Sequence, residues 1–125
     1  MKTISTDKAP QPAGHYSQAV VCGGVIYVAG QLAGNPAAPD APPGDAGAQT
    51  KQALANVSAI LDAAGSGLRH VLQMTIYVTD VALWPEVNAA YASVLGDHRP
   101  ARAIVPVGPL HGGYVIEIQA TAALP

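Results

Sequence analysis

Apolar residues recur at helical spacing between residues 46 and 64, which predicts an amphipathic helix in the middle of the chain. Asp45 stands where a helix N-cap is expected, and Gly65 follows the last periodic residue directly. The polar residues of this segment fall on the opposite side of the helix. Such an arrangement is typical of a helix that lies on a sheet.

A second helix is predicted from about Ala82 to Leu95. Pro85 is compatible with a first helical turn, and Gly96 ends the apolar pattern. Trp84 and Tyr91 fall on the apolar side of this helix, so we expect both in the core rather than in contact with a ligand.

Strand patterns surround these two helices. The pair Gly23-Gly24 between two short apolar runs indicates a β-hairpin. The stretch from Gly34 to Gly47 is dense in Pro, Gly, Ala and Asp and is interpreted as a long loop, of the kind that is often functional or mobile. Runs rich in β-branched or alternating residues predict five strands, at residues 17–22, 25–29, 70–79, 101–107 and 114–122.

The predicted order is therefore β-β-α-β-α-β-β, an α+β sandwich in which a mixed sheet carries two helices on one face. No linker, repeat or block of charge divides the 125 residues, so we interpret residues 1–125 as a single domain.

Composition adds an expectation about assembly. Half of the residues are apolar and 11% are charged, which leaves little polar surface and favours a homo-oligomer. The six Lys and Arg residues are scattered and the net charge is −2, so nucleic acid is a poor candidate partner. No apolar stretch resembles a signal peptide or reaches the ~18 residues needed to span a bilayer, so we expect a cytoplasmic protein without a membrane partner.

Two charged residues stand in strongly apolar strands. Arg102 lies in Pro100-Ala101-Arg102-Ala103-Ile104, and Glu117 lies within Val115-Ile116-Glu117-Ile118. A charge in such a setting is normally paired or functional, because burying it alone is costly. One interpretation is a structural ion pair between them, or two solvated edge residues. The other is functional: Arg102 would bind a carboxylate through its planar fork of donors, and Glu117 would position and deprotonate a water.

The other chemically reactive residues give weaker signals. Cys22 is the single cysteine, so it can form no internal disulfide, and we expect it to be a small buried apolar residue. The four histidines show no helical ligand spacing and have no cysteine partners, so we expect no metal site.

Across nearly its whole length the sequence resembles the reactive-imine deaminase (RidA, YjgF) family. The order and spacing of several short motifs carry the resemblance: Gly14-His15-Tyr16-Ser17-Gln18-Ala19, Gly30-Gln31, Asn56-Val57, Val87-Asn88, Pro100-Ala101-Arg102 and Ile116-Glu117-Ile118.

The resemblance implies a chorismate-mutase-like homotrimer, with sites in the clefts between subunits and no cofactor or metal. Members with an arginine at the position of Arg102 hydrolyse small 2-imino or enamine acids, such as 2-aminoacrylate, 2-iminopropanoate and 2-iminobutanoate, to 2-keto acids and ammonia. By the same resemblance, Arg102 would bind the substrate carboxylate, Glu117 would orient the water, and Tyr16 would close the pocket. Gly30, Ala29, the backbone of Ile104 and, more weakly, Asn88 would line it.

Two positions depart from the family pattern. Ala29 stands where many members have Ser or Thr, which removes a possible hydrogen bond to ligand. Ile104 stands where many have Cys, which makes the pocket more apolar. Three other functions therefore stay open: a non-catalytic protein that binds carboxylate metabolites, a deaminase specific to one pathway, and an endoribonuclease, against which the lack of a basic patch counts.

Overall fold

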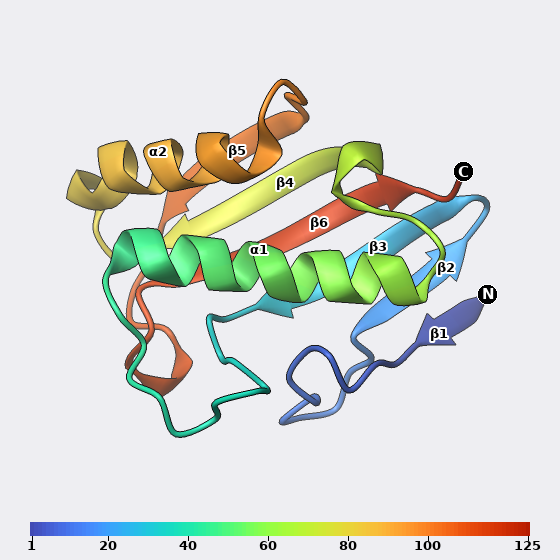
Figure 1. Ribbon diagram of the computed structural model, residues 1–125, viewed down its shortest axis with the longest axis horizontal. Coiled ribbons are helices and arrows are strands. Elements are labelled where there is room, and N and C mark those ends of the chain that lie inside the picture. Colours follow the sequence, from blue (N-terminus) through green and yellow to red (C-terminus); the bar gives the residue numbers. More distant parts are fainter.

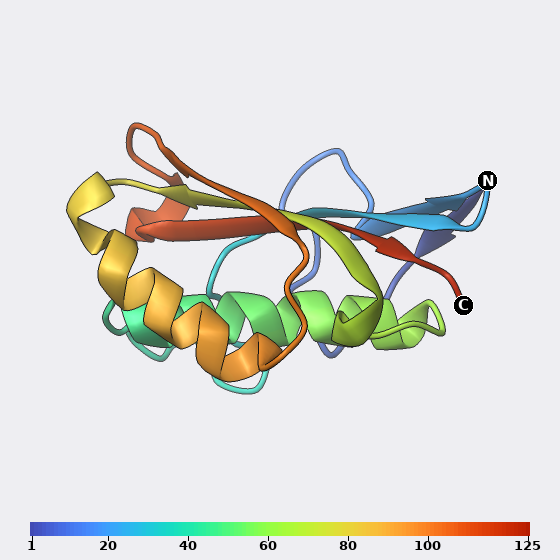
Figure 2. The same cartoon turned by 90° about the horizontal axis from the view of Figure 1, so that it is seen from above.

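The computed structural model describes residues 1–125 and contains one six-stranded sheet with both long helices on the same face (Figures 1 and 2). The strand order is β1-β2-β3-β6-β4-β5, and every pair is antiparallel except β4–β5. The elements are β1 Lys2–Ile4, β2 Ala19–Cys22, β3 Val25–Gln31, α1 Ala46–Ala63, β4 Val71–Val78, α2 Trp84–Leu95, β5 Ala101–Pro106 and β6 Ile116–Ala123, with short 3-10 turns at Leu68–His70, Val81–Leu83 and His111–Gly113.

The predicted α+β class and helix arrangement are confirmed, with one strand more than expected. β1 pairs with β2 at the edge of the sheet. Its three residues were not predicted because only Ile4 is buried, which leaves no alternating pattern to detect.

The ends of the helices follow the local rules that the sequence suggested. The carboxylate of Asp45 accepts a hydrogen bond from the Ala48 amide at 2.8 Å and caps α1. Gly65 and Gly96, which follow the two helices, have φ of 86° and 61° and so adopt a backbone conformation that glycine tolerates best.

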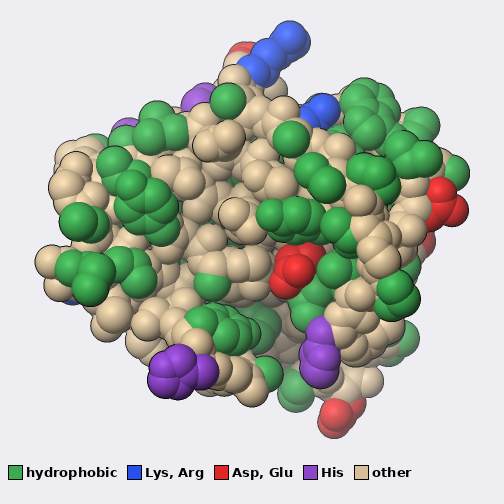
Figure 3. Space-filling model, turned by 180° about the vertical axis from the view of Figure 1, so that it is seen from behind, with side chains coloured by type: hydrophobic (Ala, Val, Ile, Leu, Met, Phe, Trp, Pro, Cys, Tyr) green, Lys and Arg blue, Asp and Glu red, His purple; other side chains and the backbone are tan.

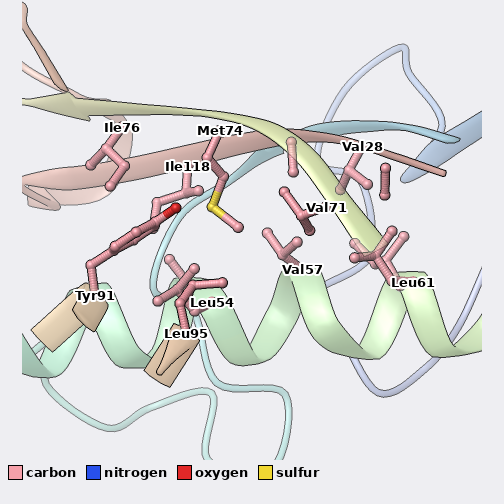
Figure 4. Packing of buried hydrophobic residues seen from close by; sticks show 14 of the residues in the cluster. Val28, Leu54, Val57, Leu61, Val71, Met74, Ile76, Tyr91, Leu95 and Ile118 are labelled. Carbon is pink, nitrogen blue, oxygen red and sulfur yellow. The ribbon is translucent and has the colours of Figure 1, made fainter. Parts of the chain in front are cut away.

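The core lies between the sheet and α1 (Figure 4). Leu54, Val57 and Leu61 of α1 point toward the inner face of the sheet, where Met74 and Ile118 are fully buried. A buried side chain of this kind contributes about 1.5–3 kcal/mol of hydrophobic free energy. This layer makes the sheet a rigid base for the residues on it.

Two predictions about burial were wrong. Cys22 is exposed, because it ends β2 beside the Gly23-Gly24 turn and its side chain is on the face away from the helices. Trp84 is 42% exposed, because it opens α2 and its ring lies beside the edge strand β5 rather than over the core. Tyr91, by contrast, is buried in the core as expected.

No helix covers the other face of the sheet (Figure 2). Strand register places Tyr27, Tyr77, Glu117 and Gln119 on this open face, and Tyr27 is 53% exposed. In Figure 3 hydrophobic side chains are scattered over this face around an acidic side chain near its middle, and Lys and Arg appear toward its margins. None of the helices in the chain is long and apolar enough to cross a membrane.

Candidate functional site

Arg102 lies on the edge strand β5, on the same side of the sheet as the helices. Its register partner on β4 is Met74, which is fully buried beneath the helices, and partners in a ladder point to the same face. The guanidinium Nη1 donates a hydrogen bond to Oδ1 of Asn88 on α2 at 2.9 Å. Asn88, a weak candidate from the sequence, therefore contacts Arg102 directly.

Two aromatic rings of α2 flank the guanidinium. Its carbon lies 4.8 Å from the centre of the Tyr91 ring and 5.8 Å from that of Trp84, both within the range of a cation–π contact. Burial raises the pKa of the Tyr91 hydroxyl, and the positive charge of Arg102 offsets part of that rise. Together these groups fix the Arg102 head while leaving most of its five N–H donors without a partner in the chain.

A cavity of about 530 Å³ opens beside this arginine, between α2 and the start of β5. Arg102 shares its lining with Asn88, Tyr91, His98 and Arg99, and no acidic residue takes part. Such a lining is suited to an anion, and the fork of Arg102 is suited to a carboxylate in particular.

Glu117 lies on the opposite face. It pairs with Tyr77 of β4, while its neighbours Ile116 and Ile118 are buried beneath the helices. The alternation predicted for this strand from residue 116 onward is therefore confirmed. Glu117 and Arg102 lie on opposite faces and form no ion pair with each other, so a structural ion pair between them is absent from the single chain.

Gly30 leaves the space that the Glu117 carboxylate occupies. A β-bulge between Val28 and Gln31 brings Gly30 against Glu117, so that a Cβ added at Gly30 would lie 2.9 Å from Oε2 and 3.0 Å from Cδ. Any side chain at this position would displace the carboxylate. The predicted association of Gly30 with the site thus has a steric basis, and Ala29 lies next to it in the same bulge.

A cavity of about 200 Å³ borders the Glu117 side chain. Tyr16 and Gly30, both predicted site residues, line it together with Pro10 and Tyr114. Tyr16 is half-exposed, and its hydroxyl accepts a long hydrogen bond of 3.4 Å from the Ala13 amide. Tyr114 was not predicted as a site residue, because it was expected within the strand at 114–122, where alternation places it on the face opposite Glu117. That expectation was wrong: β6 begins only at Ile116, and Tyr114 lines the cavity beside Glu117.

Three buried amide side chains hold the walls of this cavity. Gln18 donates to the carbonyls of Thr6 and Pro10 at 3.0 and 2.9 Å. Asn56 donates to those of Leu32 and Gly34 at 3.0 and 2.8 Å, and Gln49 accepts from the Val115 amide at 2.9 Å. All three side chains are at most 3% exposed, whereas the hydrogen bonds that they make to the backbone are partly buried. Sequence reasoning missed this role because a polar residue on a helix or strand end is usually solvated.

The predicted site residues thus form two groups. Tyr16, Gly30 and Glu117 meet on the open side, whereas Arg102 and Asn88 meet on the helix side, with β4 between β5 and β6. The side chain of Ile104 is directed to the helix side and packs on the core. No group of three His, Cys, Asp or Glu side chains is arranged to hold a metal ion.

Comparison with known proteins gives a consistent result. The sequence pattern of the family described as Endoribonuclease L-PSP matches residues 6–124. A 2-iminobutanoate/2-iminopropanoate deaminase of Rattus norvegicus is 40% identical over 121 residues, which cover 97% of this chain and 88% of the relative.

Two solved structures are similar to the chain over almost its full length. The YjgF gene product of E. coli superposes with a TM-score of 0.94 at 38% identity, with all of both chains covered. E. coli TdcF with bound serine superposes with a TM-score of 0.92 at 32% identity, with 98% of each chain covered. With the fold, the motifs and these likenesses in agreement, the chain belongs to the endoribonuclease L-PSP family, that of the RidA and YjgF proteins.

Proposed function

We propose that this protein is a deaminase that hydrolyses small 2-imino acids, such as 2-iminopropanoate and 2-iminobutanoate, to 2-keto acids and ammonia. The observation that carries the proposal is the presence, in one chain, of a carboxylate receptor at Arg102 and an unpaired carboxylate at Glu117, each beside its own cavity. Relatives that are 40% identical carry the corresponding name.

The chemistry needs few groups. Arg102 would bind the substrate carboxylate through the donors that Asn88 leaves free. Glu117 would take a proton from a water as its oxygen attacks the imine carbon, and would pass that proton to the nitrogen, which gives a carbinolamine. Transfer of the remaining hydroxyl proton to the nitrogen by the same carboxylate would then let the C–N bond break as the C=O bond forms, so that the 2-keto acid and ammonia leave. Because the imine carbon is already electrophilic, holding the water and the substrate in register supplies much of the rate enhancement.

The two groups would meet between subunits. In one chain, Arg102 and Glu117 are separated by two strand spacings, about 10 Å, and they lie on opposite faces of the sheet. In the substrate, by contrast, the carboxylate is bonded directly to the imine carbon. One small substrate therefore cannot contact both residues of the same chain. A site formed by Arg102 of one copy and Glu117 of the next resolves this, and a ring of three copies would contain three such sites.

The open face of the sheet favours such an assembly. The side chains on this face include Tyr27, Tyr77 and Gln119. Among the residues of β3, β4, β5 and β6, Glu117 is the one charged residue that points to this face. An exposed sheet face with so little charge resembles the interior of an obligate oligomer.

The activity is tested with imines made in situ. An amino-acid oxidase would generate 2-iminopropanoate and 2-iminobutanoate, and semicarbazide would trap the imine that survives. We expect the native protein to suppress trapping, and both Arg102→Ala and Glu117→Ala to abolish that effect while keeping the native circular dichroism. A folded native protein that leaves trapping unchanged would exclude the deaminase function.

A mixing experiment tests the location of the site. Refolding equal amounts of the two inactive variants together would pair an intact Arg102 with an intact Glu117 at about one interface in four. We expect recovery to roughly a quarter of native activity. If the mixture stays inactive although mixed oligomers form, the two residues do not act across an interface.

A protein that binds carboxylates without turning them over is the second candidate, favoured by the serine bound to the related TdcF. Thermal stabilisation by pyruvate or serine, without any loss of imine, would support it. The endoribonuclease function that the family description names is tested by incubating the protein with RNA.

A further inference from the structure

We propose that Tyr114 determines the specificity of this site by limiting the side chain of the substrate to one or two carbons. The proposal rests on the deaminase function above. Tyr114 lines the same small cavity as Tyr16, Gly30 and Glu117, and it lies three residues before Glu117 along the chain.

The Tyr114 side chain closes one end of the cavity. A Cβ added at Gly34 would lie 3.8 Å from the Tyr114 hydroxyl oxygen and 3.3 Å from Cγ of Pro10. Tyr114, Gly34 and Pro10 therefore form a continuous wall. On the other side of the ring, a Cβ added at Gly112 would lie 3.1 Å from Cε2 of Tyr114, so the ring is packed against the turn that precedes β6.

The backbone on both sides of this wall is anchored to the scaffold. The amide of Val115, next to Tyr114, donates to the buried Gln49 side chain, and the carbonyl of Gly34 accepts from the buried Asn56 side chain. Both amides belong to α1, which is packed on the sheet by a continuous apolar layer. The backbone on both sides of the gap between Tyr114 and Gly34 is consequently anchored to α1, which sets where the Tyr114 ring begins.

The size of the cavity agrees with a small substrate. A cavity of about 150 Å³ holds one benzene molecule, and 2-iminopropanoate has as many non-hydrogen atoms as benzene. The cavity at Glu117 measures about 200 Å³, which admits that substrate or the ethyl homologue.

The direction of the substrate places its side chain at this wall. With the carboxylate drawn toward Arg102 of the neighbouring copy, the nitrogen and the side chain on the planar imine carbon both point away from Arg102. The nitrogen must lie within reach of Glu117, which would protonate it, and this leaves one direction for the side chain. The closed end of the cavity, bounded by Tyr114, is the space that remains for it.

A substrate series tests the proposal. The oxidase would supply imines from alanine, 2-aminobutyrate, leucine and phenylalanine, and kcat/KM would be measured for the native protein, Tyr114→Phe and Tyr114→Ala. We expect the native protein to prefer the first two imines by at least about 10-fold, since excluding one methylene is worth about 10- to 200-fold. Tyr114→Ala should raise kcat/KM for the two large imines about 10-fold, whereas Tyr114→Phe should keep the native order because the ring forms the wall.

Gly34→Ala provides the opposite change, because it narrows the gap from the other side. It should lower kcat/KM for the 2-aminobutyrate imine more than for the alanine imine. If the native protein hydrolyses all four imines equally, or if Tyr114→Ala leaves their ratio unchanged, Tyr114 does not set specificity while the deaminase function stands. If the native protein hydrolyses none of them, the proposed function fails and this proposal fails with it.

Discussion

Replacing Gly30 by alanine should lower the activity of this protein without lowering its stability. The added Cβ would lie 2.9 Å from Oε2 of Glu117, whereas ordinary contact begins at 3.4 Å. The carboxylate must therefore withdraw by about half an ångström or rotate to another rotamer. A misplacement of about 1 Å can cost about 100-fold in rate, so we expect kcat/KM to fall about 10- to 100-fold.

The same substitution should not destabilise the fold. Gly30 has no positive φ, so alanine is compatible with its backbone, and the colliding group is the end of a flexible side chain. A compatible Gly→Ala change stabilises a protein by about 0.4–1 kcal/mol by reducing the freedom of the unfolded chain. Urea unfolding should therefore show Gly30→Ala to be as stable as the native protein or slightly more so.

Gly67→Ala is the matched control, because nothing lies within 4 Å of its added Cβ and Gly67 is outside both cavities. It should leave kcat/KM unchanged in the imine-trapping assay. A Gly30→Ala protein of native activity would contradict this prediction, and so would one whose loss of activity only follows a loss of folded protein.

Three further predictions concern the residues that support the site. The Tyr91 hydroxyl is buried without a hydrogen-bond partner, so Tyr91→Phe should raise the free energy of unfolding in urea by about 1 kcal/mol. Because the pKa of Tyr91 is raised, the folded protein keeps its hydroxyl proton above pH 10.0, where the unfolded chain releases it. The free energy of unfolding of the native protein should therefore decline above pH 10.0 more steeply than that of Tyr91→Phe. An equal decline would contradict this. Asn56→Ala should lower the free energy of unfolding by about 2 kcal/mol in the same assay, since it leaves the carbonyls of Leu32 and Gly34 without their hydrogen-bond donor. An Asn56→Ala protein as stable as the native one would show that these bonds are not needed. Arg102→Lys keeps the charge but loses the planar fork, so kcat/KM should fall at least about 10-fold through a higher KM, and a native KM would argue against bidentate binding.

Local rules made much of the fold predictable. The Asp45 cap, the glycines after both helices and the Gly23-Gly24 turn each act within a few residues, and all were correctly placed from the sequence. β1 was not found because three residues with one buried side chain carry no pattern. Trp84 was wrongly assigned to the core because helical spacing does not reveal where the sheet beneath a helix ends.

The candidate site was predictable in part. Arg102 and Glu117 could be identified because each is a single charge in an apolar strand. Their placement on opposite faces could not, because β5 has apolar residues on both sides and its phase is ambiguous. The contact between Gly30 and Glu117 depends on a bulge, and the wall at Tyr114 depends on hydrogen bonds between residues 66 positions apart, so neither leaves a local sequence signal.

The position of β6 in the sheet has a consequence for biosynthesis. It is the last of the six strands along the chain, yet it lies between β3 and β4 and pairs with both. A growing polypeptide that ends before residue 116 would present two unpaired apolar strand edges at once, which is the condition that promotes aggregation. The sheet can therefore close only once β6 has been synthesised, and until then the facing edges of β3 and β4 stay open.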